Sequence, residues 1–151
     1  MTYAQWADRA VGYLIDSLLV GAAMGILYLI LGTFLAVIAG GLGASDQFAS
    51  GACCMLIILF PISSLLVGFF NRVYLVSKRG ASIGQGVMKL KVVDANGNLL
   101  SIGTALLRLI AQVGIGLVPL GTILDLLWPL WDDKRQTLHD KVVGSFVLKQ
   151  A

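Results

Sequence analysis

The sequence predicts an all-α membrane protein with two transmembrane helices, a broken two-arm apolar hairpin, a small cytoplasmic β-hairpin and a C-terminal strand. Hydrophobic residues make up 58% of the 151-residue chain and charged residues only 13%, whereas soluble domains average about 25% charged residues. Two long stretches, residues 17–45 and 47–71, contain no charged side chain, and every Lys and Arg lies outside them. A soluble chain of this size cannot bury that much apolar surface, so lipid is the expected solvent.

The first helix is expected at residues 8–38 and the second at residues 50–76. Each uncharged stretch is longer than the roughly 20 residues that cross a bilayer. The 39–49 loop between them contains one Asp and no Lys or Arg, while the segment that follows the second stretch is basic. The positive-inside rule therefore places this loop outside, and the N-terminus, the 72–101 segment and the C-terminus in the cytoplasm.

Residues 77–101 are expected to form a cytoplasmic loop that contains the β-hairpin. The Val-rich segment 88–94 is followed by Asn-Gly at 96–97 and a second apolar run, and Asn-Gly between apolar runs is a strong hairpin signal. In the C-terminal tail, 132–151, residues 142–148 also read as a strand. We expect this strand to pair with the hairpin, since two strands alone are marginally stable.

Residues 103–131 are apolar but contain Arg108 and Asp125, and Gly and Pro residues interrupt their middle. A single crossing would place the basic tail outside the cell. Two short helices, at about 103–116 and 120–131, would return the tail to the cytoplasm. We expect this helical hairpin, whose arms either span the membrane or re-enter it.

Charged side chains inside the apolar stretches are the candidate functional residues. Asp16 lies inside the first helix, and Arg9 lies two turns earlier on the same face. An ionised Asp is costly in hydrocarbon, so Asp16 is expected to face the protein and to find a partner. Arg108 is the best distant candidate. Asp16 then either binds a proton or cation, or belongs to a structural ion pair that holds the helices together.

The two arms of the helical hairpin supply further polar residues. Arg108 and Asp125 fall at similar depths when the chain folds back between the arms. One interpretation is that they line a polar pocket with Asp16 and Gln112. The other is that both lie near the membrane interface, where long side chains reach water.

Small residues and the C-terminal polar residues are interpreted structurally. Gly21, Gly25 and Gly32 lie on one face of the first helix and favour close helix packing, either against the second helix or against another subunit. His139 is expected to be an ordinary interfacial residue. Asp140 is expected to cap the C-terminal strand or to anchor it against a Lys or Arg of the cytoplasmic loop.

The sequence lacks enzyme signatures such as HExxH, GxSxG and the Walker A motif. We therefore expect a non-enzymatic protein with no metal and no cofactor. The net charge is +3, but the basic residues flank helices as membrane topology requires, so no nucleic-acid partner is expected. The expected partners are the lipid bilayer and either other membrane subunits or further copies of the chain, because so few helices hardly enclose a pathway alone.

Three ordered blocks, which cover nearly the whole chain, carry a family resemblance. They are Arg9 with residues 13–16, residues 82–85 with 89–94, and residues 127–132 with 134–141. Together they resemble the RDD family of bacterial membrane proteins, which is named for one Arg and two Asp. The Pro-Leu-Trp-Asp and Lys-Arg-Gln-Thr-Leu segments of the third block are most similar to its actinobacterial, proline-rich-antigen-type branch.

By motif position, Arg9 and Asp16 correspond to the family's Arg and first Asp, and Asp140 corresponds to the second Asp. The family's Thr-Pro-Gly-Lys-like turn is Ser-Ile-Gly-Gln at residues 82–85, so its Pro and Lys are missing here. The resemblance implies a multi-pass protein of the bacterial cytoplasmic (inner) membrane whose biochemistry is largely unassigned.

Some members of this family have been linked to sodium/proton antiport, and others resemble accessory parts of larger assemblies. Two functions are therefore expected at nearly equal weight. One is transport of a small ion or solute through the buried Asp and Arg residues. The other is a role as an accessory subunit of a larger membrane complex, such as a respiratory-chain assembly.

Overall fold

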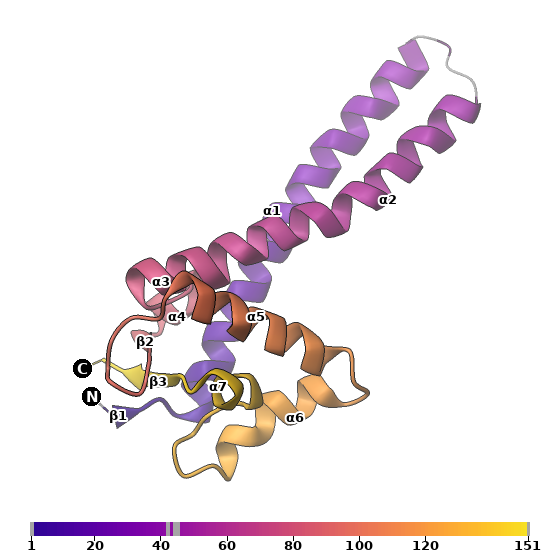
Figure 1. The fold of residues 1–151 in the computed structure, drawn as a ribbon. Coiled ribbons are helices and arrows are strands. Elements are labelled where there is room, and N and C mark those ends of the chain that lie inside the picture. Colours follow the sequence, from indigo (N-terminus) through magenta and orange to yellow (C-terminus); the bar gives the residue numbers. More distant parts are fainter. Residues whose placement is uncertain (1, 42, 44–45, 151) are drawn as a thin grey trace. The chain divides into compact units, whose positions relative to one another are not determined.

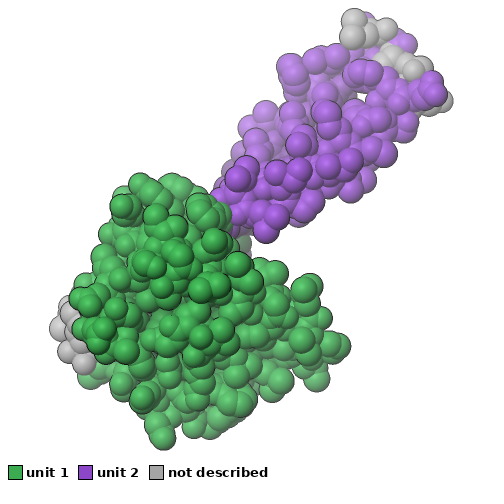
Figure 2. Space-filling model, in the orientation of Figure 1, with its two compact units in different colours: residues 1–17, 69–151 green, residues 18–68 purple. Residues whose placement is uncertain are grey.

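The computed structural model describes residues 2–41, 43 and 46–150, and it divides into two compact units. Residues 1–17 and 69–151 form one, called here the polar unit, and residues 18–68 form the other, called the hairpin unit (Figure 2). Helix α1 (Trp6–Gly41) begins in the polar unit and continues into the hairpin unit.

The hairpin unit consists of two antiparallel helical segments, the larger part of α1 and α2 (Asp46–Phe69) (Figure 1). Tyr28 joins them: its hydroxyl lies 2.9 Å from Ser63 Oγ, and its ring contacts the edge of Phe60 at a centroid distance of 5.2 Å. Met24 is buried there. Most other apolar side chains on these segments are exposed, so the unit keeps a wide apolar surface.

Both long helices extend beyond their predicted bounds. The first, predicted at 8–38, is α1. The second, predicted at 50–76, starts with α2 and continues through a π-helical turn, Phe70–Tyr74, and α3 (Leu75–Arg79). The predicted 39–49 loop is shorter as a result, and its residues 42, 44 and 45 lie outside the described part of the chain.

Two helices are long and apolar enough to cross a membrane, Trp6–Gly41 and Ser50–Arg79. Only 6% and 0% of the residues in their most apolar stretches are buried. The central helix of a soluble domain would bury such a stretch. These helices instead present it outward, as lipid-facing helices do.

A three-stranded antiparallel sheet joins the two ends of the chain in the polar unit. Its order is β1 (Thr2–Tyr3), β3 (Phe146–Lys149) and β2 (Leu90–Val93). The sheet forms a small apolar core together with residues from the π-helical turn and from nearby helices and loops. The core residues are Ala4, Val73, Val76, Leu90, Val92, Leu100, Ala105 and Val147.

The predicted β-hairpin at 88–100 is wrong in one respect. The Asn-Gly turn forms, with Gly97 at φ +82° and Asp94 Oδ1 accepting hydrogen bonds from the backbone N–H groups of Asn96 and Asn98. The residues after the turn form no strand, however, and β2 pairs with β3 instead. The chain leaves the turn for α5 (Ile102–Gly116), which Ser101 caps at its N-terminus.

The predicted C-terminal strand at 142–148 begins too early. Its first residues belong to α7 (Leu138–Val143), and the strand β3 follows at Phe146–Lys149. Thr137 and Asp140 form a reciprocal capping box at the start of α7, which satisfies two helix-end donors. This local capping outweighs the strand preference of the paired valines. The predicted pairing of a C-terminal strand with the Val-rich segment is confirmed.

The two-arm hairpin predicted over 103–131 is confirmed. Its first arm is α5, and its second is α6 (Gly121–Leu127), extended by a 3-10 turn at Trp128–Leu130. The chain reverses between the arms, where Leu120 adopts a positive φ of +63°. A Cβ at Gly121 would lie 1.9 Å from the Ile115 carbonyl oxygen, so only glycine fits this close reversal.

Candidate functional site

Asp140 is the centre of a buried charge network in the polar unit. Its side chain is fully buried in the first turn of α7. Arg9 Nη1 donates to Asp140 Oδ2 at 2.6 Å, and Arg108 Nε donates to Oδ1 at 2.8 Å. Ser145 Oγ donates to Oδ1 at 2.9 Å. The network therefore ties α1, α5 and the C-terminal segment to one carboxylate.

This environment keeps Asp140 ionised. Burial raises the pKa of a carboxyl group, but the charges of Arg108, His139 and Arg9 act in the opposite direction, and the hydrogen bond from Arg9 adds to them. The net result is a pKa of Asp140 well below its usual range. The predicted anchoring of Asp140 by a basic residue of the cytoplasmic loop is wrong, because its partners come from α1 and α5.

Asp16 is held by uncharged donors. Asn71 Nδ2 donates to Oδ1 at 2.9 Å, the backbone N–H of Gly84 donates to the same oxygen at 2.7 Å, and Ser82 Oγ donates to Oδ2 at 2.5 Å. Asp16 is only 5% exposed. The prediction that it pairs with Arg108 is wrong, since Arg108 binds Asp140.

The turn at residues 82–85 reaches Asp16 because α1 and α4 (Ile83–Val87) approach very closely. A Cβ at Gly84 would lie 2.1 Å from the carbonyl oxygen of Gly12. Ser82 caps α4 and forms a capping box with Gln85. Gln85, which stands at the position of the family's Lys, completes the capping box, while Ser82 and Gly84 of the same turn hold the Asp16 carboxylate.

Asp125 and His139 form a second buried pair. Asp125 Oδ2 lies 2.6 Å from His139 Nδ1, and its Oδ1 accepts from the His139 backbone N–H at 3.0 Å. His139 is 6% exposed, which contradicts the prediction of an ordinary interfacial residue. Its Nε2 lies 3.2 Å from Thr137 Oγ1.

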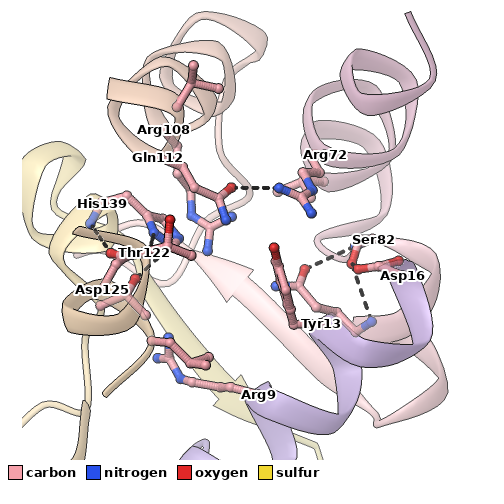
Figure 3. A pocket seen from close by; sticks show the side chains of 15 residues that line it. Arg9, Tyr13, Asp16, Arg72, Ser82, Arg108, Gln112, Thr122, Asp125 and His139 are labelled. Atoms are coloured by element: carbon pink, nitrogen blue, oxygen red, sulfur yellow. Dashed lines mark hydrogen bonds and ion pairs between the residues drawn. The ribbon is translucent and has the colours of Figure 1, made fainter. Parts of the chain in front are cut away.

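The buried pairs surround a cavity of about 270 Å³ within the polar unit (Figure 3). The four residues predicted to share a pocket all line it: Asp16, Arg108, Gln112 and Asp125. Arg108 and Asp125 are 8% and 7% exposed, so the alternative in which their side chains extend to water does not describe this structure. Further polar side chains on the wall are Arg9, Tyr13, Arg72, Ser82, Gln85, Thr122, Thr137 and His139.

Arg72 and Gln112 form the opposite wall of the cavity. Arg72 Nη1 donates to Gln112 Oε1 at 3.0 Å, and the guanidinium lies over the Tyr13 ring at 5.2 Å. In Figure 3, Arg72, Arg108 and the Tyr13 hydroxyl point toward one another across the cavity. The arrangement brings three Arg side chains to a single space that small solutes can fill.

A comparison with protein families identifies the chain. The model of the RDD family matches residues 3–144. The chain belongs to the RDD family. The residues that correspond to the family's Arg and second Asp, Arg9 and Asp140, form a direct ion pair in this RDD chain. Asp16, which corresponds to the first Asp, lies in the same unit but has partners of its own.

Curated relatives of this RDD chain come from mycobacteria. It is 36% identical to the proline-rich antigen of Mycobacterium leprae over 80 residues, which cover 52% of this chain and 31% of that protein. It is 33% identical to the proline-rich antigen homolog of Mycobacterium tuberculosis over 88 residues, 58% of this chain and 35% of that protein. The matched part thus spans about a third of these relatives. No solved structure matches the chain.

The glycines predicted for helix packing have no neighbour across their face. A Cβ at Gly21, Gly25 or Gly32 would meet no atom within 4 Å among the described residues. Within the described part of the chain, these glycines therefore make no close contact with the second helix. The alternative, a contact with another subunit, stays a prediction.

Sequence reasoning missed Asn71, Ser82, Arg72 and His139 as members of the RDD chain's polar cluster. Asn71 carried a usable signal, because it is a polar residue at the end of a long uncharged stretch. Ser82 carried one too, as a helix cap within a family block. No three His, Cys or Asp side chains are close enough to hold a metal ion across residues 2–41, 43 and 46–150.

Proposed function

We propose that this RDD chain is a non-enzymatic, multi-pass protein of the bacterial cytoplasmic membrane that binds a small ion or solute in the polar-unit cavity and carries it across the membrane. One observation supports this proposal most. Three Arg and two Asp side chains line a cavity in a chain whose remaining surface is largely apolar. Intramembrane and near-membrane ionisable groups are rare and usually functional.

Exposure of the two long helices supports membrane insertion. Their most apolar stretches are almost entirely unburied, which water would not tolerate over so large an area. The proposed topology puts the N-terminus, the 72–101 segment and the C-terminus in the cytoplasm. The sheet supports a common side for all three, because β1, β2 and β3 come from these segments, and β1 and β2 each pair with β3.

A transport pathway needs more membrane-spanning helices around it than one chain supplies. Only two helices of the described chain are long enough to span a bilayer. The proposal therefore includes assembly, either with further copies of this chain or with other membrane subunits, and lipid on the outer faces. No cofactor is part of it.

Flux through liposomes tests the transport proposal. The purified chain is reconstituted, and gradients of Na⁺, K⁺, chloride or phosphate are imposed while internal pH and tracer uptake are followed. We expect flux above protein-free vesicles for at least one solute. Gln112→Leu, which removes a cavity-wall partner of Arg72, is expected to reduce it. Ile110→Ala, on the exposed side of the same helix, should leave it unchanged. Flux equal to protein-free vesicles under every gradient contradicts transport.

A second candidate function is that of an accessory subunit. The observation that favours it is the open glycine face of α1, where a neighbouring helix would approach closely. We expect the chain to co-purify with a membrane partner in mild detergent. Gly25→Leu should abolish this co-purification, and Ala23→Leu, about half a turn away, should not. Recovery of the chain alone, without a partner, contradicts this function.

A further inference from the structure

The guanidinium of Arg9 is only partly used by the protein. Its Nη1 binds Asp140, but Nε and Nη2 are buried and have no hydrogen-bond partner among the described residues. The side chain is only 9% exposed. A buried donor without a partner is costly, and native proteins rarely leave one. Arg9 also lines the cavity, and a ligand there would satisfy these covered donors after a small rotation of the Arg9 side chain.

The shape of the unused edge defines the ligand. Nε–H and Nη2–H of a guanidinium point in parallel and match two oxygens of one carboxylate or phosphate group. Asp140 occupies only the third nitrogen, so it leaves this two-pronged edge intact. A metal ion or ammonium group has no acceptor to offer such an edge.

None of the described Asp side chains near the cavity binds the unused edge of Arg9. Asp140 is bound by two Arg side chains and Ser145, and Asp16 accepts three hydrogen bonds from neutral donors. Asp125 accepts a hydrogen bond from the His139 backbone N–H, and its other oxygen lies 2.6 Å from His139 Nδ1. The carboxylates are thus engaged by protein donors, while the unpartnered buried atoms are donors. A cavity in this state favours an anion over a cation.

Further donors face the same space. Arg72 uses only Nη1 in its bond to Gln112, and the hydroxyl of Tyr13 points into the cavity (Figure 3). Thr122 is also on the wall. The cavity volume of about 270 Å³ is close to the lower end for small-molecule sites. It therefore suits a single small oxyanion with a short substituent.

We propose that the cavity is a binding site for a phosphate group, held by the Nε and Nη2 atoms of Arg9 and by Arg72 from the opposite wall. The phosphate comes either from a free ion or from the headgroup of an anionic lipid. This proposal rests on the proposed function, since it names the ligand class of the same cavity. It also departs from the expectation that Asp16 binds a cation.

Binding to the full chain in detergent tests the proposal. Radiolabelled inorganic phosphate is titrated by equilibrium dialysis at constant ionic strength, with chloride as the balancing anion. In a parallel arm, phosphatidylglycerol is titrated into the purified chain and retained lipid is counted by native mass spectrometry. Saturable binding of inorganic phosphate assigns a free-ion site. Saturable lipid binding without phosphate binding assigns a headgroup site.

Two variants and one control connect binding to the cavity. Arg9→Lys keeps a positive charge beside Asp140 but removes the two parallel N–H donors, Nε and Nη2. Arg72→Gln removes the positive charge from the opposite wall of the cavity. Each is expected to weaken binding about tenfold to a hundredfold, the loss that follows from one or two charge-assisted hydrogen bonds. Lys78→Gln removes an exposed positive charge outside the cavity and should leave binding unchanged. Circular dichroism and melting temperature establish that each variant is folded.

The outcomes separate this inference from the proposed transport function. The phosphate site is overturned if neither arm shows saturable binding. It is also overturned if Lys78→Gln loses as much binding as the folded variants Arg9→Lys and Arg72→Gln. Cation flux without phosphate binding overturns the site and leaves transport standing. Saturable phosphate binding that depends on Arg9 and Arg72, without flux of any solute, supports the site and contradicts transport.

Discussion

Different kinds of interaction stabilise the two units of this protein internally. The polar unit buries charged side chains and pairs them, with Asp140 bound to Arg9 and Arg108, and with Asp125 bound to His139. The hairpin unit has one inter-helix side-chain hydrogen bond among its described residues, Tyr28 to Ser63. Helix α1 contributes to both units, so its sequence changes from polar to apolar within a single helix.

This contrast shows which interactions specify each part. In the hairpin unit, most apolar side chains are exposed and make few contacts within the unit, so few individual contacts matter. In the polar unit, each buried carboxylate depends on a few named partners. Single substitutions should therefore cost far more stability in the polar unit, and the following predictions test that difference.

The largest effect is expected for Asp140→Asn. It leaves the Arg9 and Arg108 charges in a buried site without a carboxylate, and breaking a buried ion pair costs about 3–5 kcal/mol. The free energy of unfolding in mixed micelles, followed by circular dichroism, measures this loss. Asp133→Asn, at an exposed neighbouring acid, should change the free energy by less than about 0.5 kcal/mol. Similar losses in both variants would show that the network does not stabilise the fold.

Acid should produce a smaller, graded version of the same loss. The pKa of Asp140 in the folded state lies well below its usual range, so ionised Asp140 contributes its full stability above the pKa that the carboxyl group has in the unfolded chain. This stability is lost as pH falls from about 4 toward the folded-state pKa. Melting temperatures between neutral pH and pH 3 should fall for the wild type. The part due to Asp140 should be absent in Asp140→Asn, and identical slopes for both proteins would contradict the assignment.

Gly84→Ala is expected to cost about 1–3 kcal/mol, the usual range for overpacking. The new Cβ would lie 2.1 Å from the Gly12 carbonyl oxygen and 2.9 Å from the Asp16 backbone nitrogen, so α4 must move away from α1. Gly86→Ala is the matched control, because a Cβ there meets nothing within 4 Å. Thermal melts of the two variants should differ clearly. Equal melting temperatures would argue against the close α1–α4 approach.

The smallest effect is expected in the hairpin unit. Tyr28→Phe removes the hydrogen bond to Ser63 but keeps the ring contact with Phe60, and such bonds contribute about 0.6 kcal/mol in membrane helices. Tyr74→Phe, at an exposed tyrosine, serves as the control in the same unfolding assay. A loss for Tyr28→Phe as large as that for Asp140→Asn would remove the contrast between the units.

Sequence reasoning located the polar residues but not their partners. Arg9, Asp16, Arg108 and Asp125 were identified because charges within apolar stretches are costly and must be explained. The pairing of Arg108 with Asp140 instead of Asp16 depends on how α5 and α7 pack, and a residue pattern along one chain contains no such distance. The donors to Asp16 are neutral, so an argument that searched for an opposite charge passed over Asn71 and Ser82.

The fold was predicted best where an element is marked by its own continuous stretch of sequence. The uncharged stretches identified α1 and α2, and the glycines and proline identified the break between α5 and α6. The prediction of a β-hairpin was wrong because the turn signal at Gly97 concerns only neighbouring residues, whereas the partner of β2 lies more than 50 residues away in β3. At Val142, strand preference misled the assignment, although Thr137 and Asp140 have the spacing of a capping box.

The long separation between partners has a consequence for biosynthesis. Arg9 lies 131 residues before Asp140, and Asp16 lies 55 to 68 residues before its three donors. At about 5–20 residues per second, the ribosome needs roughly 7–26 s to make the stretch between Arg9 and Asp140. During that interval Arg9 lacks the Asp140 carboxylate, and during the first part of it Asp16 lacks its donors. Assembly of the polar unit is therefore completed only after α7 and β3 have emerged, and a chain that stops before α7 leaves Arg9 without the Asp140 carboxylate.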